Sequence, residues 1–157
     1  MMIDTSTRRN LELVETLREK QKRGSLLWVL DKTKTAMGAR LLRSFIEQPL
    51  IDKEEIERRQ QAIEELNMNY ISREEIREYL NSVYDLERLM GRISYKTANP
   101  RDLLSFKNSL EMLPYIKDIL GEFSCELLKK MNEDLDPLRD LYELIGGSST
   151  MERSISS

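Results

Sequence analysis

The sequence predicts an all-α fold, an irregular multi-helix bundle formed by a chain of 157 residues. Leu, Glu, Arg, Lys and Ile dominate the composition, whereas Pro, Gly and aromatic residues are scarce, and this balance favours helices over strands. Apolar residues also recur at helical spacing along most of the chain, and residues that cap helix N-termini precede these runs. The first four residues, "MMID", could instead form a short strand.

The composition excludes several classes of function. The formal net charge is -3 and the pI is about 5.3, which argues against a stand-alone nucleic-acid-binding protein. There is no histidine and a single cysteine, Cys125, which excludes the commonest general base, a thiolate metal cage and an internal disulfide. Neither GxxxxGKS/T nor GxGxxG occurs. We therefore expect no catalytic, cofactor-binding or metal-binding residues, and we assign no DNA-binding residue.

The expected compartment is the cytoplasm. No secretory signal is visible, and no apolar run approaches the roughly 20 residues that a membrane helix needs. A reducing compartment also suits Cys125, which we interpret as a small packing residue.

The most basic segment is the first, "MMIDTSTRRNLELVETLREKQKRG". Leu11, Val14 and Leu17 have helical spacing, but they also fit an extended arm that is followed by a charged loop. The basic residues of the segment are Arg8, Arg9, Arg18, Lys20, Lys22 and Arg23, and Glu12, Glu15 and Glu19 partly offset them. The simpler interpretation is a solvated face, and contact with phosphate is the alternative.

Two helices follow this segment. Ser25 is a good N-cap for "SLLWVLD", and we expect Trp28, the only tryptophan, to pack in the core. In "TKTAMGARLLRSFIEQPL", Thr35 is a good N-cap for a helix that begins at Ala36 and that Pro49 ends. Its apolar stripe consists of Met37, Leu41, Leu42, Phe45 and Ile46. Gly38 costs about 1 kcal/mol relative to Ala within a helix, so we expect it to permit the close approach of another backbone.

The middle of the chain predicts further capped helices. Asp52 and Glu55 form a capping pair before "EEIERRQQAIEEL". Ser72 is the expected N-cap of the next helix, in "SREEIREYLNSVYDLERLMGRISY". The apolar spacing there fits either one long helix or two helices, and we favour a break near Tyr84–Asp85.

The last third predicts three further helical stretches and a tail. Asn99 caps a helix with Pro100 at its first position, and Pro114 closes this helix or starts a new one. "SCELLKKMNE" is a second helical run, and Asp136 caps a third. We expect a helical domain over residues 1–145 and a flexible tail or linker over 146–157, because "GGSSTMERSISS" is small and polar.

Several of these segments together resemble the core, or lever, domain (domain III) of the MutS family of DNA mismatch-recognition proteins. The resemblance is carried, in this order, by "IDTSTRRNLEL", "GSLLWVLDKTKTAMGARLLRSFIEQPL", "ERRQQAIEEL", "DLERLMGRI" and "NPRDLLSFKNSLEMLP". It implies a structural motif at Asn10, Thr33, Thr35, Gly38, Arg40, Leu41, Leu42, Pro49, Leu50, Arg59, Asp85, Glu87, Arg88, Arg92 and Pro100.

The resemblance also implies a role. Proteins similar to MutS are dimers that encircle DNA, and the core connects their ATPase to the clamp that grips the duplex. The chain is then a non-enzymatic, allosteric domain, truncated before the clamp, with no cofactor of its own. ATP and Mg belong to the parent protein. The implied partners are mismatched duplex DNA, the other MutS domains, a second MutS subunit and, as a further candidate, a MutL-type protein.

Alternatives remain open at two points. Asp85 and Arg88 fit either an exposed helix pair, which contributes roughly 0–1 kcal/mol, or a buried joint between helices. The function could also be that of a free-standing helical adaptor that binds other proteins. A small helix-turn-helix DNA-binding protein is less favoured, because the chain is acidic and no basic recognition helix is visible.

Overall fold

The computed structural model describes residues 1–146, in which all regular structure is helical, so the all-α prediction is confirmed. The chain divides into two compact units, Met1–Arg59 and Gln60–Ser157. The predicted tail over 146–157 lies outside the described residues, apart from Gly146. Among the described helices, none is both long and apolar enough to cross a membrane.

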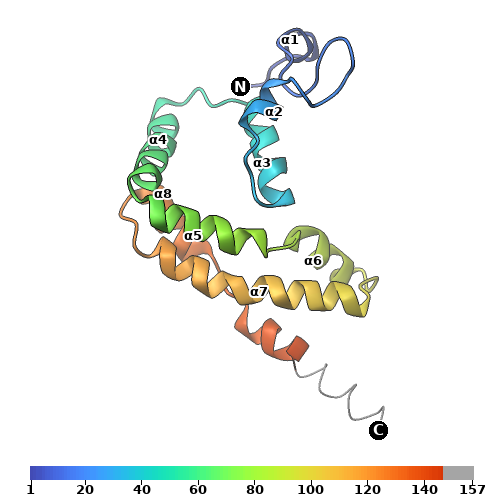
Figure 1. Ribbon diagram of the computed structural model, residues 1–157, viewed down its shortest axis with the longest axis vertical. Coiled ribbons are helices and arrows are strands. Elements are labelled where there is room, and N and C mark those ends of the chain that lie inside the picture. Colours follow the sequence, from blue (N-terminus) through green and yellow to red (C-terminus); the bar gives the residue numbers. More distant parts are fainter. Residues whose placement is uncertain (147–157) are drawn as a thin grey trace. The chain divides into compact units, whose positions relative to one another are not determined.

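The first unit contains α1 (Thr5–Asn10), α2 (Leu26–Leu30) and α3 (Ala36–Glu47) (Figure 1). The short strand that "MMID" could form is not observed in the part of the chain that the structure describes. Asp4 instead caps α1, because its Oδ1 accepts a hydrogen bond from the Thr7 backbone N–H at 2.9 Å. A strand needs a neighbouring strand to satisfy its backbone groups. Here the Met1 amino group instead donates to the Pro49 carbonyl (3.1 Å).

A long loop joins α1 to α2, so the helical alternative for Leu11, Val14 and Leu17 is wrong. Backbone hydrogen bonds close the base of this loop, from Leu26 to Glu12 (3.1 Å) and from Leu27 to Leu13 (2.9 Å). Leu13 and Leu27 are buried. Burial of these two leucines therefore fixes the ends of a loop whose middle is polar.

The prediction that Trp28 packs in the core is wrong, because 47% of its surface remains exposed. The predicted N-cap is confirmed, since the Ser25 hydroxyl accepts from the Trp28 backbone N–H at 3.2 Å. The helix that follows has only 5 residues and buries Leu27 alone. One turn and a half presents too narrow a face to bury the leucine and the indole together.

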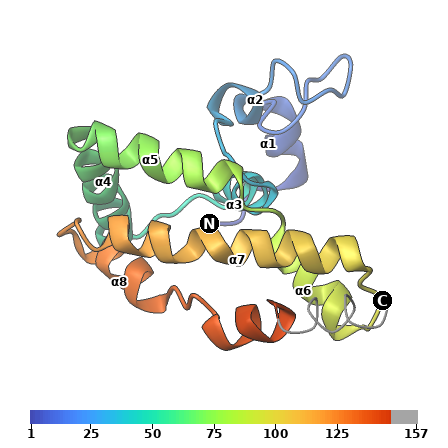
Figure 2. The same cartoon turned by 60° about the horizontal axis from the view of Figure 1, so that its bottom comes forward.

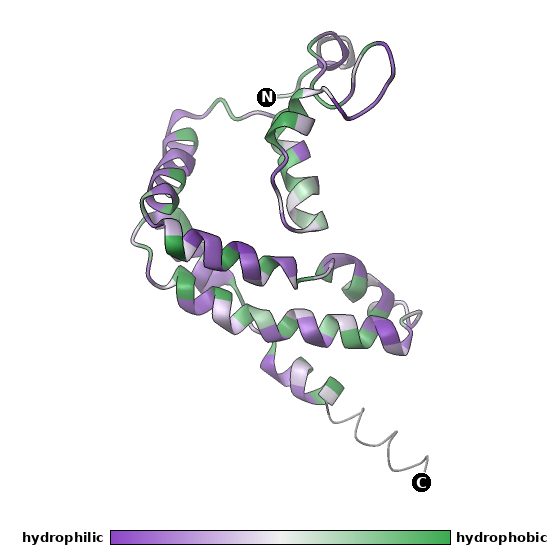
Figure 3. Ribbon diagram, viewed as in Figure 1, coloured by the Kyte–Doolittle hydropathy of each residue, from purple (hydrophilic) through white to green (hydrophobic). Residues whose placement is uncertain are grey.

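The second unit is built around the longest helix, α7 (Pro100–Leu120), which contacts α5 (Tyr70–Asn81), α6 (Leu86–Ser94) and α8 (Glu126–Asp134). Figure 2 shows α5 running alongside α7. A further helical segment covers residues 139–146. The helix α4 (Lys53–Met68) crosses the boundary between the units, and Figure 3 shows that it is mainly hydrophilic.

Two hydrophobic clusters form the core of the second unit, and α7 contributes to both. The first joins α6, α7 and the segment after α8 through Leu89, Phe106, Leu110, Leu113 and Ile145. The second joins α4, α7, α8 and the turn between the last two through Ala62, Ile119, Phe123 and Leu128. The two clusters are therefore connected through a single helix.

Three predicted helix boundaries are wrong. The last helical segment begins at residue 139, so Asp136 is not its N-cap, and the Asp136 carboxylate accepts from the Leu138 backbone N–H instead (2.9 Å). Ser72 is not an N-cap, since α5 begins at Tyr70 and the Ser72 hydroxyl donates to Glu122 at 2.9 Å. Pro114 neither ends nor restarts a helix, since α7 continues through it. Buried Leu113 and Ile116 lie on either side of this proline, so packing offsets the backbone hydrogen bond that proline cannot donate.

Candidate functional site

Polar contacts connect separate segments of the second unit at three places, which we call the polar joints; two of them involve α7, and the third connects α4 to the N-terminus of α8. Each connects residues that are at least ten positions apart in the chain. The joints are Tyr84 with Ser109, Arg92 with Asp102, and Glu65 with Ser124 and Cys125.

The first joint fixes the break between α5 and α6, which the sequence predicts near Tyr84–Asp85 and the structure confirms. The hydroxyl of Ser109, which is fully buried on α7, accepts from the Tyr84 backbone N–H at 2.9 Å and donates to the Ser105 carbonyl at 2.8 Å. Asp85 then caps α6 by accepting from the Arg88 backbone N–H (3.2 Å). The break is therefore anchored on its α7 side by one buried hydroxyl.

The second joint lies where α6 turns into α7. Arg92 Nη1 forms an ion pair with Asp102 Oδ1 at 2.8 Å. Asp102 also completes a capping box with Asn99, and Pro100 occupies the first helical turn as predicted. The backbone N–H of Asn99, and then Arg92, lower the pKa of the Asp102 carboxyl. The partner of Arg92 is thus on α7, whereas Asp85 contacts the Arg88 backbone.

The third joint caps α8 from a distant part of the chain. One carboxylate oxygen of Glu65 on α4 accepts from the backbone N–H and the hydroxyl of Ser124, at 2.6 and 2.7 Å. Its other oxygen accepts from the Cys125 backbone N–H at 2.8 Å. The Ser124 hydroxyl and these two amides lower the pKa of Glu65 to about 2, so the carboxylate is charged at neutral pH. A negative charge at a helix N-terminus also interacts favourably with the helix dipole.

Cys125 belongs to the same joint. It occupies the N-cap position of α8, where its own side chain makes no capping hydrogen bond. Burial raises the pKa of its thiol, and the neighbouring Glu65 carboxylate raises it further, so the group stays protonated. This environment is that of a packing residue and not of an activated nucleophile.

Most of the remaining residues of the predicted motif lie in the first unit, where Thr33, Thr35 and Gly38 form the turn that leads into α3. Thr35 caps α3 by accepting from the Gly38 backbone N–H at 3.0 Å, as predicted. Thr33 donates to Asp31 at 2.6 Å, and Lys22 pairs with the same carboxylate. The hydrogen bond from Lys22, and then the one from Thr33, lower the pKa of Asp31 to about 2.

Gly38 has a different role from the one expected. A Cβ there would lie 3.2 Å from Thr35 Oγ1 and 3.5 Å from Thr33 Cβ. The close neighbours of this glycine are therefore the two threonine side chains and not another backbone. Glycine leaves room for the cap that holds the turn in place.

The other motif residues of this unit are spread over its surface. Arg59 stacks on the Phe45 ring, with the guanidinium carbon 3.8 Å from the ring centroid. Asn10, Arg40 and Leu41 are exposed, whereas Leu42, Pro49 and Leu50 are half-buried. In the second unit, Glu87 is exposed on the first turn of α6.

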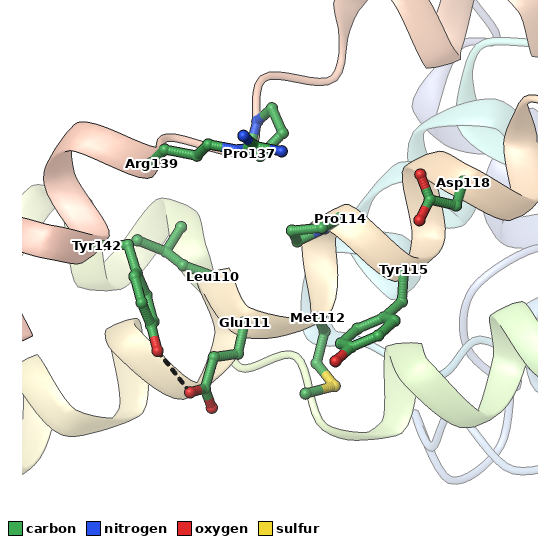
Figure 4. Close-up of a pocket in the computed structure, with 9 residues that line it drawn as sticks. All are labelled: Leu110, Glu111, Met112, Pro114, Tyr115, Asp118, Pro137, Arg139 and Tyr142. Carbon is green, nitrogen blue, oxygen red and sulfur yellow. Dashed lines mark hydrogen bonds between the residues drawn. The ribbon is translucent and has the colours of Figure 1, made fainter.

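A pocket of about 570 Å³ opens between α7 and residues 137–142. Figure 4 shows Tyr142 reaching from the last helical segment to Glu111 on α7, and its hydroxyl donates to Glu111 Oε1 at 2.6 Å. That hydrogen bond raises the pKa of Tyr142. The lining combines apolar rings with Glu111, Asp118 and Arg139, and it pairs no nucleophile with a general base. Among residues 1–146, no group of acidic or thiol side chains could hold a metal ion.

The comparison with known protein families decides the assignment. Residues 6–156 match the family model described as MutS domain III. The chain belongs to the MutS family. The DNA mismatch repair protein MutS of Lachnoclostridium phytofermentans is 67% identical over 155 residues, which cover 99% of this chain and 17% of that protein. The MutS proteins of Clostridium novyi and Clostridium tetani are 57% and 52% identical over 148 residues, 94% of this chain and 16% and 17% of theirs.

The chain therefore spans about one sixth of the length of these MutS relatives. The matched part is domain III, which does not include the ATPase domain of the family. The polar joints lie inside this matched region. Sequence reasoning found Arg92, Asp85 and Pro100, but it missed Glu65, Ser109 and Ser124. The single local signal for the third joint was the poor capping residue Cys125 before α8.

Proposed function

We propose that this chain is the helical core of a MutS-type mismatch-recognition protein and that it passes the nucleotide state of the ATPase to the clamp that grips DNA. The observation that carries the proposal is the arrangement of the second unit, in which α7 spans both hydrophobic clusters and the polar joints fix its neighbours. A body that is fixed in this way moves as a whole when one end is displaced. The chain contributes no chemistry of its own.

The joints suit transmission because each resists sliding of one helix along another. In the first and third joints, backbone N–H groups at Tyr84, Ser124 and Cys125 donate to side chains of other helices. A slip would leave these donors without their partners, and for the partly buried Tyr84 N–H this loss costs about 1–3 kcal/mol. Apolar contacts alone are non-directional and would tolerate such a slip more easily.

The proposal includes the wider assembly. Residues 1–145 form the core domain, and 146–157 act as a tail or linker. ATP and Mg bind elsewhere in the parent protein. Its partners are mismatched duplex DNA, the other MutS domains, a second MutS subunit and a MutL-type protein, in the cytoplasm.

The test is a graft into the L. phytofermentans relative, in which this chain replaces the matching 155 residues. The grafted protein should hydrolyse ATP and release a mismatched duplex when ATP is added. Glu65→Ala in the graft should leave the basal ATPase rate within about 2-fold and slow the ATP-driven release by roughly 10-fold, because the coupling between the two sites is weakened. Glu64→Ala is the matched control, because Glu64 is exposed on the same helix.

Two results would contradict the proposal. One is release at the same rate in the Glu65→Ala and Glu64→Ala grafts. The other is a selective affinity of the isolated chain for mismatched over matched duplex, since the proposal assigns mismatch reading to another domain. The isolated chain is likewise expected not to hydrolyse ATP.

A further inference from the structure

Charge is divided unevenly between the two units of this acidic chain. Residues 1–59 contain 13 Lys and Arg against 10 Asp and Glu, whereas residues 60–157 contain 12 against 18. The net charge is therefore positive in the first unit and negative in the second. A polyanion would be attracted there and repelled by the rest of the chain.

Within the first unit, positive charge is concentrated in residues 17–24, which we call the basic loop. It holds Arg18, Lys20, Lys22 and Arg23 against a single carboxylate, Glu19, and all five are exposed. Lys22 is engaged with Asp31. Arg18, Lys20 and Arg23 have no acidic partner among the described residues.

The basic loop is held in one conformation by its own hydrogen bonds. Thr16 donates its backbone N–H to the Gln21 carbonyl (2.9 Å) and accepts from the Lys20 N–H (3.1 Å). The Glu12 carboxylate accepts from the Leu17 N–H at 2.6 Å. The Glu12 carboxylate therefore bonds to the backbone of the loop. Because the loop is already ordered, an anion that binds it does not have to order the backbone.

We infer that the basic loop binds the phosphate backbone of duplex DNA without reading its sequence. Arg18 and Arg23 each offer a planar fork of N–H donors that suits phosphate oxygens, and Lys20 of the same loop adds a point charge. The choice of DNA over another polyanion rests on the proposed function. The phosphate contact itself does not depend on the transmission role. The alternative partner of the basic loop is an acidic protein surface.

The experiment is fluorescence anisotropy of a labelled duplex of about 30 base pairs with the full chain, between about 50 and 200 mM NaCl. The loop variant is Arg18→Gln with Lys20→Gln and Arg23→Gln. The matched control removes the same charge from exposed positions of the second unit, as Arg88→Gln with Arg101→Gln and Lys129→Gln. Far-UV circular dichroism confirms that each variant is folded.

Three phosphate contacts predict a slope of about -2.7 for log K against log salt, which is a fall of roughly 40-fold over this range. The loop variant should bind at least about 10-fold more weakly at the lower salt concentration, with a slope near zero. The control should keep the slope of the unmodified chain, and matched and mismatched duplexes should bind equally.

Two outcomes would overturn the inference. The first is absence of binding at about 100 μM protein in low salt, because the dissociation constants of non-specific DNA binding lie at or below that concentration. The basic loop would then be a solvated surface or would face an acidic protein. Equal weakening in the loop variant and the control would place the contact elsewhere. Neither outcome bears on the graft experiment, so the two proposals fail separately.

Discussion

Replacement of Ser109 by alanine removes the hydroxyl that anchors the break between α5 and α6 on α7. In the unmodified chain this hydroxyl is fully buried, accepts from the Tyr84 backbone N–H and donates to the Ser105 carbonyl. Alanine fits the space, so the substitution deletes the joint without adding a steric conflict. We expect Ser109→Ala to lower the free energy of unfolding.

The magnitude follows from the groups that lose a partner. The Tyr84 N–H becomes a donor without an acceptor in a partly buried position, which costs about 1–3 kcal/mol. The Ser105 carbonyl adds no comparable cost, because it still accepts from the backbone of α7. Alanine is a better helix former than serine, which returns roughly 0.5 kcal/mol. The net loss is therefore about 0.5–2.5 kcal/mol.

The assay is urea unfolding followed by far-UV circular dichroism. Trp28 fluorescence would report on the other unit, since Trp28 lies within Met1–Arg59. Ser105→Ala is the matched control, because it makes the same change one turn earlier on α7 and removes no interhelical hydrogen bond. It should be neutral or raise stability by roughly 0.5 kcal/mol. Equal stability of the two variants would refute the role given to Ser109.

Three further predictions concern other parts of the second unit. The pKa of Glu65 lies at about 2 in the folded chain, below its ordinary value of 4.5, so the ionised carboxylate stabilises the fold above pH 4.5 and this contribution is lost as the pH falls towards 2. When the pH is lowered from 4.5 to 2, the urea concentration at the midpoint of unfolding should therefore fall less for Glu65→Ala than for the unmodified chain. Phe106→Ala, at a position that is 1% exposed, should cost roughly 3–5 kcal/mol in the same assay, and a loss below about 1 kcal/mol would contradict its place in the core. Pro114→Ala should raise the free energy of unfolding by up to about 3 kcal/mol, since it restores a hydrogen bond within α7; a loss of stability would mean that the proline ring packs better than it disturbs the helix.

The parts of the fold that sequence reasoning found depend on residues within about four positions of one another. Thr35 caps α3, Asn99 and Pro100 begin α7, and Asp85 begins α6. In each case a short polar side chain meets a backbone N–H of the next turn, and local chemistry is enough to predict it. The helical class and most helix starts could therefore be predicted.

The parts that could not be predicted depend on tertiary contacts. Glu65 and Ser124 are 59 positions apart, and Tyr84 and Ser109 are 25 apart, so no local pattern connects them. Helix propensity also misled where packing prevailed, as at Pro114 within α7. The family resemblance supplied the proposed role, but it gave no indication of which contacts hold the helices together.

The most direct test of the central claim is native-state hydrogen exchange by NMR, because the claim is that the second unit moves as one body. The amides of Tyr84, Ser124 and Cys125, which donate to the polar joints, should open with the same free energy as the Leu110 amide in the core of α7. Equal protection at these positions would show that the joints open only when the core does. Fast exchange at Ser124 and Cys125 beside a protected Leu110 would show that the joint between α4 and α8 opens while the core of α7 stays closed, and this would contradict the claim.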